Sequence, residues 1–244
     1  MTDIIAGRNP VIEALKARHP INKIMVDKNA KSHGTIIEIL NLARDRKIPV
    51  EPVEGYVLDR LLSNGKNQGV IAYIASKEYA GLDDLIAISV EKNEPPFYLI
   101  LDGIEDPQNL GAILRTAEAA GVHGVIVRAR RAVGLTSAAS KASAGAIEYV
   151  PVARVINIAQ TIETLKKHGV WTVGIDMCGK LDYTGVDFKL PTAIVIGSEG
   201  KGLSELVRKR CDVTASIPMK GKISSLNASA AAAVVLYEAL KQRA

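Results

Sequence analysis

The chain has 244 residues, of which 48% are hydrophobic and 23% charged, and its formal net charge is +5. This composition is typical of a globular protein with a core, in one large domain or two small ones. No apolar run reaches the roughly 18–20 residues of a membrane span, and the early acidic residue in "MTDIIAGRNP" argues against a signal peptide. The basic excess favours a polyanionic partner, whereas only 4% aromatic residues argue against a base-stacking platform.

The two cysteines, Cys178 and Cys211, are far apart and form neither a CxxC pair nor a zinc-ligand spacing. We therefore expect a reducing cytoplasm, two inert thiols and no metal site.

The first 76 residues alternate between short helix and strand patterns, which predicts a small α/β lobe. Asn9 and Pro10 predict a helix start, with Asn9 as the N-cap and Pro10 at the first helical position. The expected elements are a helix within residues 7–18, a strand over 21–27, a helix over 34–47, a strand over 48–53, a helix over 56–63 and a strand over 69–76.

Residues 77–96 contain a short helix pattern, end in Asn-Glu-Pro-Pro and are the expected linker. A second lobe follows over residues 97–244, in which continuous apolar strands alternate with helices. This pattern predicts a mostly parallel sheet covered on both faces. The expected strands cover residues 97–103, 124–129, 149–155, 171–177, 192–198 and 213–219, and the expected helices cover 109–121, 137–146, 157–169, 204–211 and the C-terminal residues.

Ligands of such sheets sit at the carboxyl ends of the strands, and three strand–helix junctions carry unusual residues. In the first, "LDGIEDPQNLGAILRTAEAAG", Asn109 is either a helix cap or a site residue. Arg115 lies in an otherwise apolar helix, where it either extends to the surface or offers a fixed cation to a phosphate. The acidic pair Glu105 and Asp106 is expected to be a solvated loop.

The second junction, "AIVIGSEGKGLSELV", joins a buried strand to a glycine-rich loop that opens a helix. Glycines permit positive φ and close approach of backbone N–H groups to a ligand. The stretch fits neither a Walker A loop, because Leu203 follows Gly202, nor the G-x-G-x-x-G order of a dinucleotide fingerprint. Glu199 either complements a helix dipole or belongs to a site, and a simple phosphate cradle would repel it.

The third junction runs from Ile217, through a Lys/Gly loop, into "SSLNASAAAA" at residues 224–233. A helix cap followed by close packing of alanines explains much of it. Capping alone does not explain the clustering of Ser224, Ser225, Asn227 and Ser229.

Together these junctions resemble the three signature motifs of the SpoU (TrmH) family of RNA ribose 2′-O-methyltransferases, in the SPOUT superfamily. The matching stretches are "NLGAILRTAEAAG", "IVIGSEGKGL" and "IPMKGKISSLNASAAAAVVLYE", and the resemblance covers roughly residues 97–244. The first lobe resembles the L30e-like RNA substrate-binding domain of one branch. Within the family the chain most resembles the members that methylate a guanosine ribose in the P loop of 23S ribosomal RNA.

The resemblance implies a deep trefoil knot at the C-terminus, a homodimer, and S-adenosylmethionine as methyl donor. The implied partner is 23S ribosomal RNA or its assembly intermediates, without a membrane or a metal. The implied cofactor-binding residues are Gly197, Ser198, Ile217, Met219 and Leu226. The implied catalytic residues are Asn109, Arg115, Glu199, Ser225 and Asn227, with Ser229 as a further polar neighbour.

A ribose hydroxyl is a poor nucleophile at neutral pH and needs a base or an electrostatic helper. Our hypothesis is that Arg115 accepts or stabilises the departing proton, and that Glu199 and the two asparagines orient it or the ribose. Transfer RNA, or another ribosomal site, is an alternative substrate. A non-catalytic RNA-binding protein and a dinucleotide-dependent oxidoreductase are the alternative classes, and the second lacks its fingerprint.

Overall fold

The computed structural model describes residues 2–30, 34–62, 67–75, 78–130 and 132–244. The chain forms two compact units, one made of Met1–Glu78 with Gly134–Tyr149 and the other of Tyr79–Val133 with Val150–Ala244. The expected boundary between residues 76 and 77 lies outside the described residues. No described helix is both long and apolar enough to cross a membrane.

Unit 1 contains a four-stranded mixed sheet in the order β1-β4-β2-β3 among its described residues. Its buried apolar side chains come from the helices and the sheet and form two clusters, one with Leu15 and Ile39 and the other with Met25 and Leu58. Its elements are β1 (Thr2–Ala6), α1 (Arg8–Lys16), β2 (Ile21–Asp27), α2 (Thr35–Asp45), β3 (Val50–Val53), α3 (Gly55–Leu61) and β4 (Val70–Ala75).

The start of unit 1 differs from the sequence prediction. Strand β1, which we did not predict, pairs antiparallel with β4. Helix α1 begins at Arg8 with Gly7 as its N-cap, so the prediction of Asn9 as the N-cap was wrong. The chain turns at Gly7, where φ is +105°, and the side chain of Gln68 accepts from the Arg8 amide at 2.9 Å. That bond satisfies a helix-end donor for which a cap would otherwise be needed.

Residues 134–149 group with unit 1, whereas the sequence placed them within the second lobe. They contain α6 (Ser137–Ala142) and the 3-10 helix η1 (Ala146–Glu148), and α6 contacts β1. Glu148 lies 2.9 Å from the imidazole of His19, and the hydroxyl of Tyr149 donates to Glu13 at 2.5 Å.

Unit 2 contains a seven-stranded sheet in the order β7-β6-β5-β10-β8-β11-β9 within its described residues. Every strand pair in it is parallel, which confirms the predicted α/β class. The strands are β5 (Phe97–Asp102), β6 (Gly124–Arg128), β7 (Val152–Val155), β8 (Trp171–Ile175), β9 (Leu181–Asp182), β10 (Thr192–Gly197) and β11 (Val213–Ser216). The central strands β5 and β10 are buried along their whole length.

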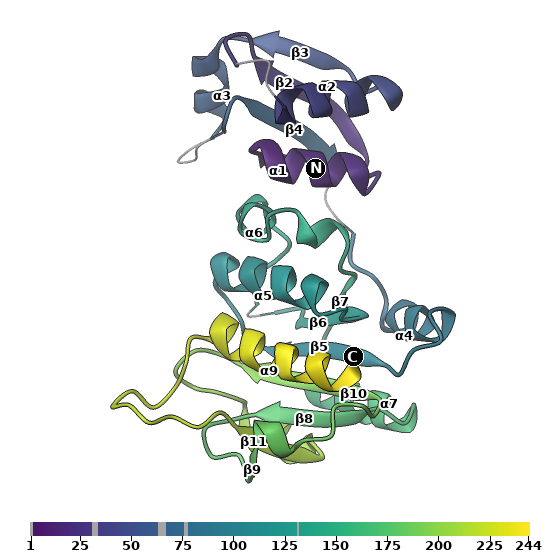
Figure 1. Ribbon diagram of the computed structural model, residues 1–244, viewed down its shortest axis with the longest axis vertical. Coiled ribbons are helices and arrows are strands. Elements are labelled where there is room, and N and C mark those ends of the chain that lie inside the picture. The colour runs from purple at the N-terminus through teal and green to yellow at the C-terminus, as the bar shows by residue number, and fades with distance from the viewer. Residues whose placement is uncertain (1, 31–33, 63–66, 76–77, 131) are drawn as a thin grey trace. The chain divides into compact units, whose positions relative to one another are not determined.

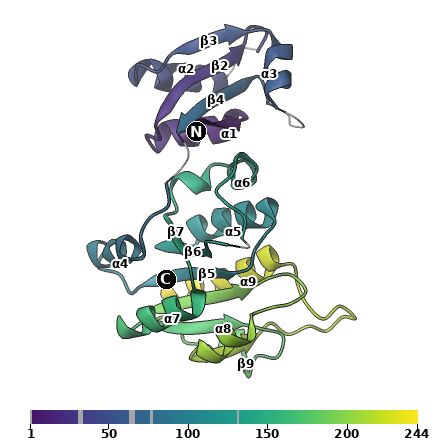
Figure 2. The same cartoon turned by 180° about the vertical axis from the view of Figure 1, so that it is seen from behind.

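Helices cover both faces of this sheet (Figures 1 and 2). On one face α9 packs against α5 and β10, and on the other α7 contacts α8 and β8. Neighbouring strand residues alternate between the faces, so Tyr98 and Ile100 join Ile162 of α7 in one core cluster. The helices are α4 (Leu82–Glu91), α5 (Pro107–Ala119), α7 (Ile158–Lys167), α8 (Glu205–Arg210) and α9 (Ala228–Arg243), and the 3-10 helix is η2 (Tyr183–Gly185).

Helix α4 lies in the segment expected to be the linker and belongs to unit 2. It contacts β7, and its buried Leu85 joins the same core cluster as Tyr98. The hydroxyl of Tyr98 lies 3.0 Å from that of the buried Ser89. These contacts explain why the short helix pattern seen in the sequence forms a stable element.

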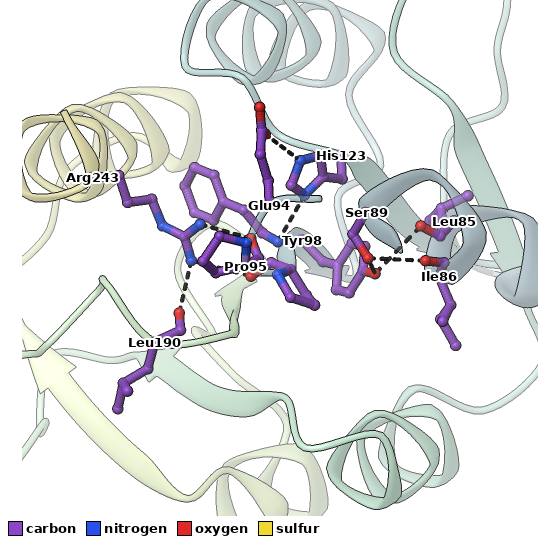
Figure 3. Close-up of polar contacts among 11 residues, drawn as sticks. Leu85, Ile86, Ser89, Glu94, Pro95, Tyr98, His123, Leu190 and Arg243 are labelled. Atoms are coloured by element: carbon purple, nitrogen blue, oxygen red, sulfur yellow. Dashed lines mark hydrogen bonds and ion pairs between the residues drawn. The ribbon is translucent and has the colours of Figure 1, made fainter. Parts of the chain in front are cut away.

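The C-terminal end of α9 is clamped to the amino-terminal edge of the sheet (Figure 3). The guanidinium of Arg243 donates to the carbonyls of Pro95 at 2.9 Å, Pro96 at 3.1 Å and Leu190 at 2.8 Å. It also lies 4.4 Å from the centre of the Phe97 ring, within the range of a cation–π contact. Burial lowers the pKa of Arg243, and Glu94 opposes this effect.

Candidate active site

A cavity of about 340 Å³ opens where β8, β10 and β11 end. This is the carboxyl edge of the parallel sheet, where ligands of such folds are expected. We call it the cofactor cavity. The predicted cofactor-binding residues Gly197, Ser198, Ile217, Met219 and Leu226 all line it, together with Glu199 and Ser225.

The glycine-rich motif forms a tight loop at one wall of this cavity. Ser198 and Gly202 pair with each other, with the Ser198 amide donating at 3.1 Å and the Gly202 amide at 2.9 Å. Gly200 and Gly202 have φ of +75° and +64°, a region that side chains with a Cβ rarely adopt. At Gly197 a Cβ would overlap the backbone of Gly202 and Leu203. The glycines are therefore required for the shape of the loop.

Side chains from the three motifs meet beside this loop. The amide of Asn109 donates to Glu199 Oε1 at 3.1 Å, and the amide of Asn227 donates to Asn109 Oδ1 at 3.0 Å. Asn227 also donates to Glu199. One carboxylate thus accepts from two amides that are far apart in the sequence, and Asn109 is buried while it does so. A closed polar network of this kind fixes the orientation of each member.

The structure settles what these residues do locally. The N-cap of α5 is Asp106, whose carboxylate accepts from the amides of Gln108 and Asn109, so the side chain of Asn109 is free for the network. Glu199 precedes α8 by several residues and does not act as its cap. Asn227 is the N-cap of α9, because its Oδ1 accepts from the amides of Ser229 and Ala230 while its amide group serves the network. The hydroxyl of Ser229 donates to the same Oδ1 at 2.5 Å.

The fold keeps Arg115 away from this network and from the cofactor cavity, which Ser225 lines. Arg115 is exposed on α5, and six residues along a helix place it on a different face from Asn109. Arg115 lines neither the cofactor cavity nor the adjacent cavity that contains Asn109. No described residue forms an ion pair with Arg115.

Asp102, the last residue of β5, is a structural residue that the sequence did not single out. Its buried carboxylate accepts from Arg128 at 2.9 Å and from the amide of Ser204 at 2.9 Å. It therefore joins the ends of β5 and β6 to the start of α8. An aspartate that ends a fully apolar strand was the available signal, since a buried carboxylate needs such partners.

The cofactor cavity suits a ligand that is partly apolar and carries positive charge. Ile196, Ile217 and Leu226 supply apolar walls, whereas Asp176 and Glu199 supply carboxylates. Its described lining contains neither lysine nor arginine. A purine and a sulfonium centre fit this environment, because apolar walls accept a base and carboxylates favour a nearby cation.

Comparison with protein families now decides the assignment. The SpoU rRNA Methylase family matches residues 96–237, and the family of RNA 2′-O ribose methyltransferase substrate-binding domains matches residues 4–80. The chain belongs to the SpoU rRNA methylase family. The first match contains the three motifs, the glycine loop and the asparagine network, and the second lies in unit 1 apart from its last two residues.

Similar proteins agree with this membership in the SpoU family. YacO of Bacillus subtilis, assigned to the TrmH family of tRNA/rRNA methyltransferases, is 47% identical over 99% of this chain and 96% of its own length. The SpoU methyltransferase AviRb of Streptomyces viridochromogenes, solved with AdoMet, superposes with a TM-score of 0.82 at 29% identity over 98% of this chain and 90% of its own. An AdoMet-bound rRNA methyltransferase of Sinorhizobium meliloti superposes with a TM-score of 0.81 at 26% identity, over 98% and 87%.

Proposed function

We propose that this protein methylates the ribose 2′-hydroxyl of a guanosine in the P loop of 23S ribosomal RNA. The broader activity, S-adenosylmethionine-dependent RNA 2′-O-methylation, is that of its family. The proposal rests on the contact between a cavity and a polar network. The cofactor cavity and the network of Asn109, Glu199 and Asn227 meet at Glu199, so a methyl donor and a hydroxyl acceptor can be held side by side.

The cofactor-binding part of the proposal rests on the lining of the cavity. S-adenosylmethionine supplies an electrophilic methyl group on a sulfonium. Gly197 and Ser198 would hold it through the backbone of the glycine loop, and Ile217, Met219 and Leu226 would contact its apolar parts. Glu199 would favour the positive sulfonium at short range.

The catalytic part rests on positioning. The ribose oxygen must approach the methyl group in line, and orienting two bound substrates provides much of the rate enhancement in such reactions. Ser225 and the amides of Asn109 and Asn227 would hydrogen-bond the ribose. Arg115 would accept or stabilise the proton that leaves the hydroxyl. An arginine is normally protonated, so stabilisation by charge is the role its chemistry favours.

The position of Arg115 supports a homodimer. It is exposed on α5 and lines neither cavity of its own chain, so it would act in the site of a partner subunit. Helix α9 also presents a stripe of small or apolar side chains, in which Ala230 and Tyr237 are exposed and Ala233 and Val234 are half-buried. Tyr237 is 53% exposed. Such a stripe suits close packing against a second copy.

The route of the C-terminal segment supports the expected knot. β11 lies beyond β8, on the side away from β10, whereas α9 packs on α5 and β10. The chain between β11 and α9 therefore returns past the glycine loop and bonds to it through Asn227 (Figure 1). We propose that residues 217–227 pass through that loop region as a trefoil knot. A crystal structure in which this segment ran outside it would refute the knot.

Unit 1 is proposed to bind the RNA, because its match is to a substrate-binding domain. The protein would act in the cytoplasm, where its free cysteines stay reduced. The name of YacO mentions both transfer and ribosomal RNA, so transfer RNA is the second candidate.

Mapping ribose methylation in total RNA from a deletion strain tests the substrate. Loss of methylation at the P-loop guanosine, restored by the wild-type gene, is the expected result, and loss in transfer RNA instead would replace our substrate. Arg115→Ala should abolish methyl transfer and leave binding of S-adenosylmethionine unchanged in calorimetry. Mixing Arg115→Ala with a second inactive variant, Asn109→Ala, should restore part of the activity if Arg115 acts across the dimer.

A further inference from the structure

The carboxyl edge of the unit 2 sheet carries more than the cofactor cavity. A second cavity, of about 430 Å³, lies at the ends of β5 and β10 and shares Ser198, Glu199 and Gly202 with the cofactor cavity. We call it the central cavity. A third, of about 450 Å³, lies beyond the ends of β6 and β7 and shares Arg128 and Ser204 with the central cavity. We call it the arginine groove. The three follow the strand order of the sheet, and neighbouring cavities share lining residues.

The charge of the lining changes from one cavity to the next. The cofactor cavity has two carboxylates and no cationic side chain in its described lining. The central cavity, which contains Asn109, is lined by the cations Arg128 and Lys201 and by four carboxylates, those of Asp102, Glu105, Asp106 and Glu199. The arginine groove has Arg128 and Arg130 and no carboxylate among its lining residues. A substrate that extended from the methyl donor to the arginine groove would therefore place its end beside two guanidinium groups. An anionic group at that end would suit this charge.

The two arginines of the groove differ in what they already bind. Arg128 pairs with the buried carboxylate of Asp102 at 2.9 Å, so part of its charge is compensated and its position is fixed. Arg130 is exposed, and none of the described residues forms an ion pair with it. Its guanidinium can therefore donate two parallel hydrogen bonds to a phosphate, which is the geometry that arginine favours.

The groove also has an apolar wall. Ile156 and Leu206 both line it, and their exposures of 89% and 54% are high for such side chains. A ligand with an apolar face next to an anionic group would cover them. Free phosphate has no such face, whereas a nucleotide has both, with its base against the apolar wall and its phosphate at the arginine.

We propose that the arginine groove binds the RNA nucleotide that neighbours the target, with its phosphodiester at Arg130 and its base against Ile156 and Leu206. This inference rests on the proposed function and deepens it. The target ribose would lie in the central cavity, beside the asparagine network. The strand would then follow the carboxyl edge of the sheet towards β7.

The test compares Arg130→Gln with Lys167→Gln, a control that removes the same charge at the opposite, exposed end of α7. Affinity for a short fluorescein-labelled single-stranded RNA of mixed sequence is measured by anisotropy at several salt concentrations. Arg130→Gln should weaken binding roughly three- to tenfold at low salt and reduce the salt dependence by about one phosphate contact. The control should bind like the wild type.

A second readout uses deproteinised ribosomal RNA as methyl acceptor. Arg130→Gln and Ile156→Ser should raise KM for RNA while leaving kcat and the affinity for S-adenosylmethionine unchanged. If Arg130→Gln binds RNA as the wild type does, the proposal is overturned, and a groove for an acidic protein segment would give that result. If the wild type binds RNA but transfers no methyl group, the proposed function fails, and the anisotropy comparison still decides the groove.

Discussion

Asn227 donates a hydrogen bond to Asn109 at 3.0 Å although 118 positions separate the two residues in the sequence. The same side chain caps α9 with its oxygen and joins the polar network of Asn109 and Glu199 with its amide group. One residue therefore connects the stability of the C-terminal helix to the geometry of the site.

The two roles of Asn227 can be separated by substitution. Asn227→Ser keeps an oxygen that can cap α9 but removes the amide that reaches Asn109 and Glu199. We expect methyl transfer to be lost while the free energy of unfolding stays close to that of the wild type. Asn227→Ala removes both roles and should also lower the free energy of unfolding by about 1 kcal/mol. Urea unfolding and a methyl-transfer assay measure the two effects, and equal stability of the two variants would contradict the capping role.

The tight packing of the glycine loop predicts that a substitution at Gly197 will distort the cofactor cavity. A Cβ at residue 197 would overlap the backbone of Gly202 and Leu203, so Gly197→Ala must displace the loop. Overpacking of this kind costs about 1–3 kcal/mol, which, if it falls on the cofactor-binding form, corresponds to a roughly 5- to 150-fold loss of affinity for S-adenosylmethionine. Gly221→Ala is the control, because a Cβ there has open space. Calorimetry should show weak binding for the first variant and wild-type binding for the second.

The clamp at the end of α9 predicts a stability effect far from the site. Arg243→Gln removes a guanidinium that donates to three carbonyls. Because hydrogen bonds of charged groups contribute about 1.5–3 kcal/mol, we expect the free energy of unfolding to fall by an amount in this range. Lys241→Gln, two residues earlier and 80% exposed, should change it little. If both variants unfold at the same urea concentration, the clamp does not stabilise the protein.

His123 predicts a dependence of stability on pH. Its buried Nδ1 accepts from the amide of Phe97 at 3.1 Å, so protonation would break that bond. Burial lowers the pKa of His123 from 6.5, although Glu94 partly opposes this. The unfolded chain therefore takes up the proton first. Stability is full above pH 6.5 and falls below it, by at most about 1.4 kcal/mol per pH unit.

An asparagine at position 123 could accept the hydrogen bond from the Phe97 amide, and its side chain does not titrate. Urea unfolding at a series of pH values should show a shallower acid decline for His123→Asn than for the wild type. If the free energy of unfolding fell equally steeply with decreasing pH in both proteins, His123 would not be the source of the acid decline.

The sequence pattern was sufficient to predict most of the alternating strands and helices of the fold. Strand β10 is a continuous apolar run, and such runs predict buried parallel strands. Strand β1 was missed because the first residues contain only a short apolar stretch. The grouping of residues 134–149 with unit 1 depends on contacts such as Glu148 with His19, which no local pattern announces.

For the site, the sequence identified residue types but not their partners. The cofactor-lining residues were named from the family resemblance, and they do line one cavity. Local reasoning left Asn109 undecided between cap and site, and only the structure shows that Asp106, three residues earlier, caps the helix. The arginine groove could not be predicted, since Arg130 and Leu206 meet only when the carboxyl edge of the sheet is assembled.

The position of Asn227 and of the Arg243 clamp also affects the order of events during synthesis. Domains fold from the N-terminus as the chain emerges from the ribosome, but α9 is held in place by Arg243, which follows every strand of the sheet in the sequence. Residues 217–231 supply one wall of the cofactor cavity. A nascent chain can therefore assemble unit 1 and the seven-stranded sheet before this wall of the cofactor cavity is in place.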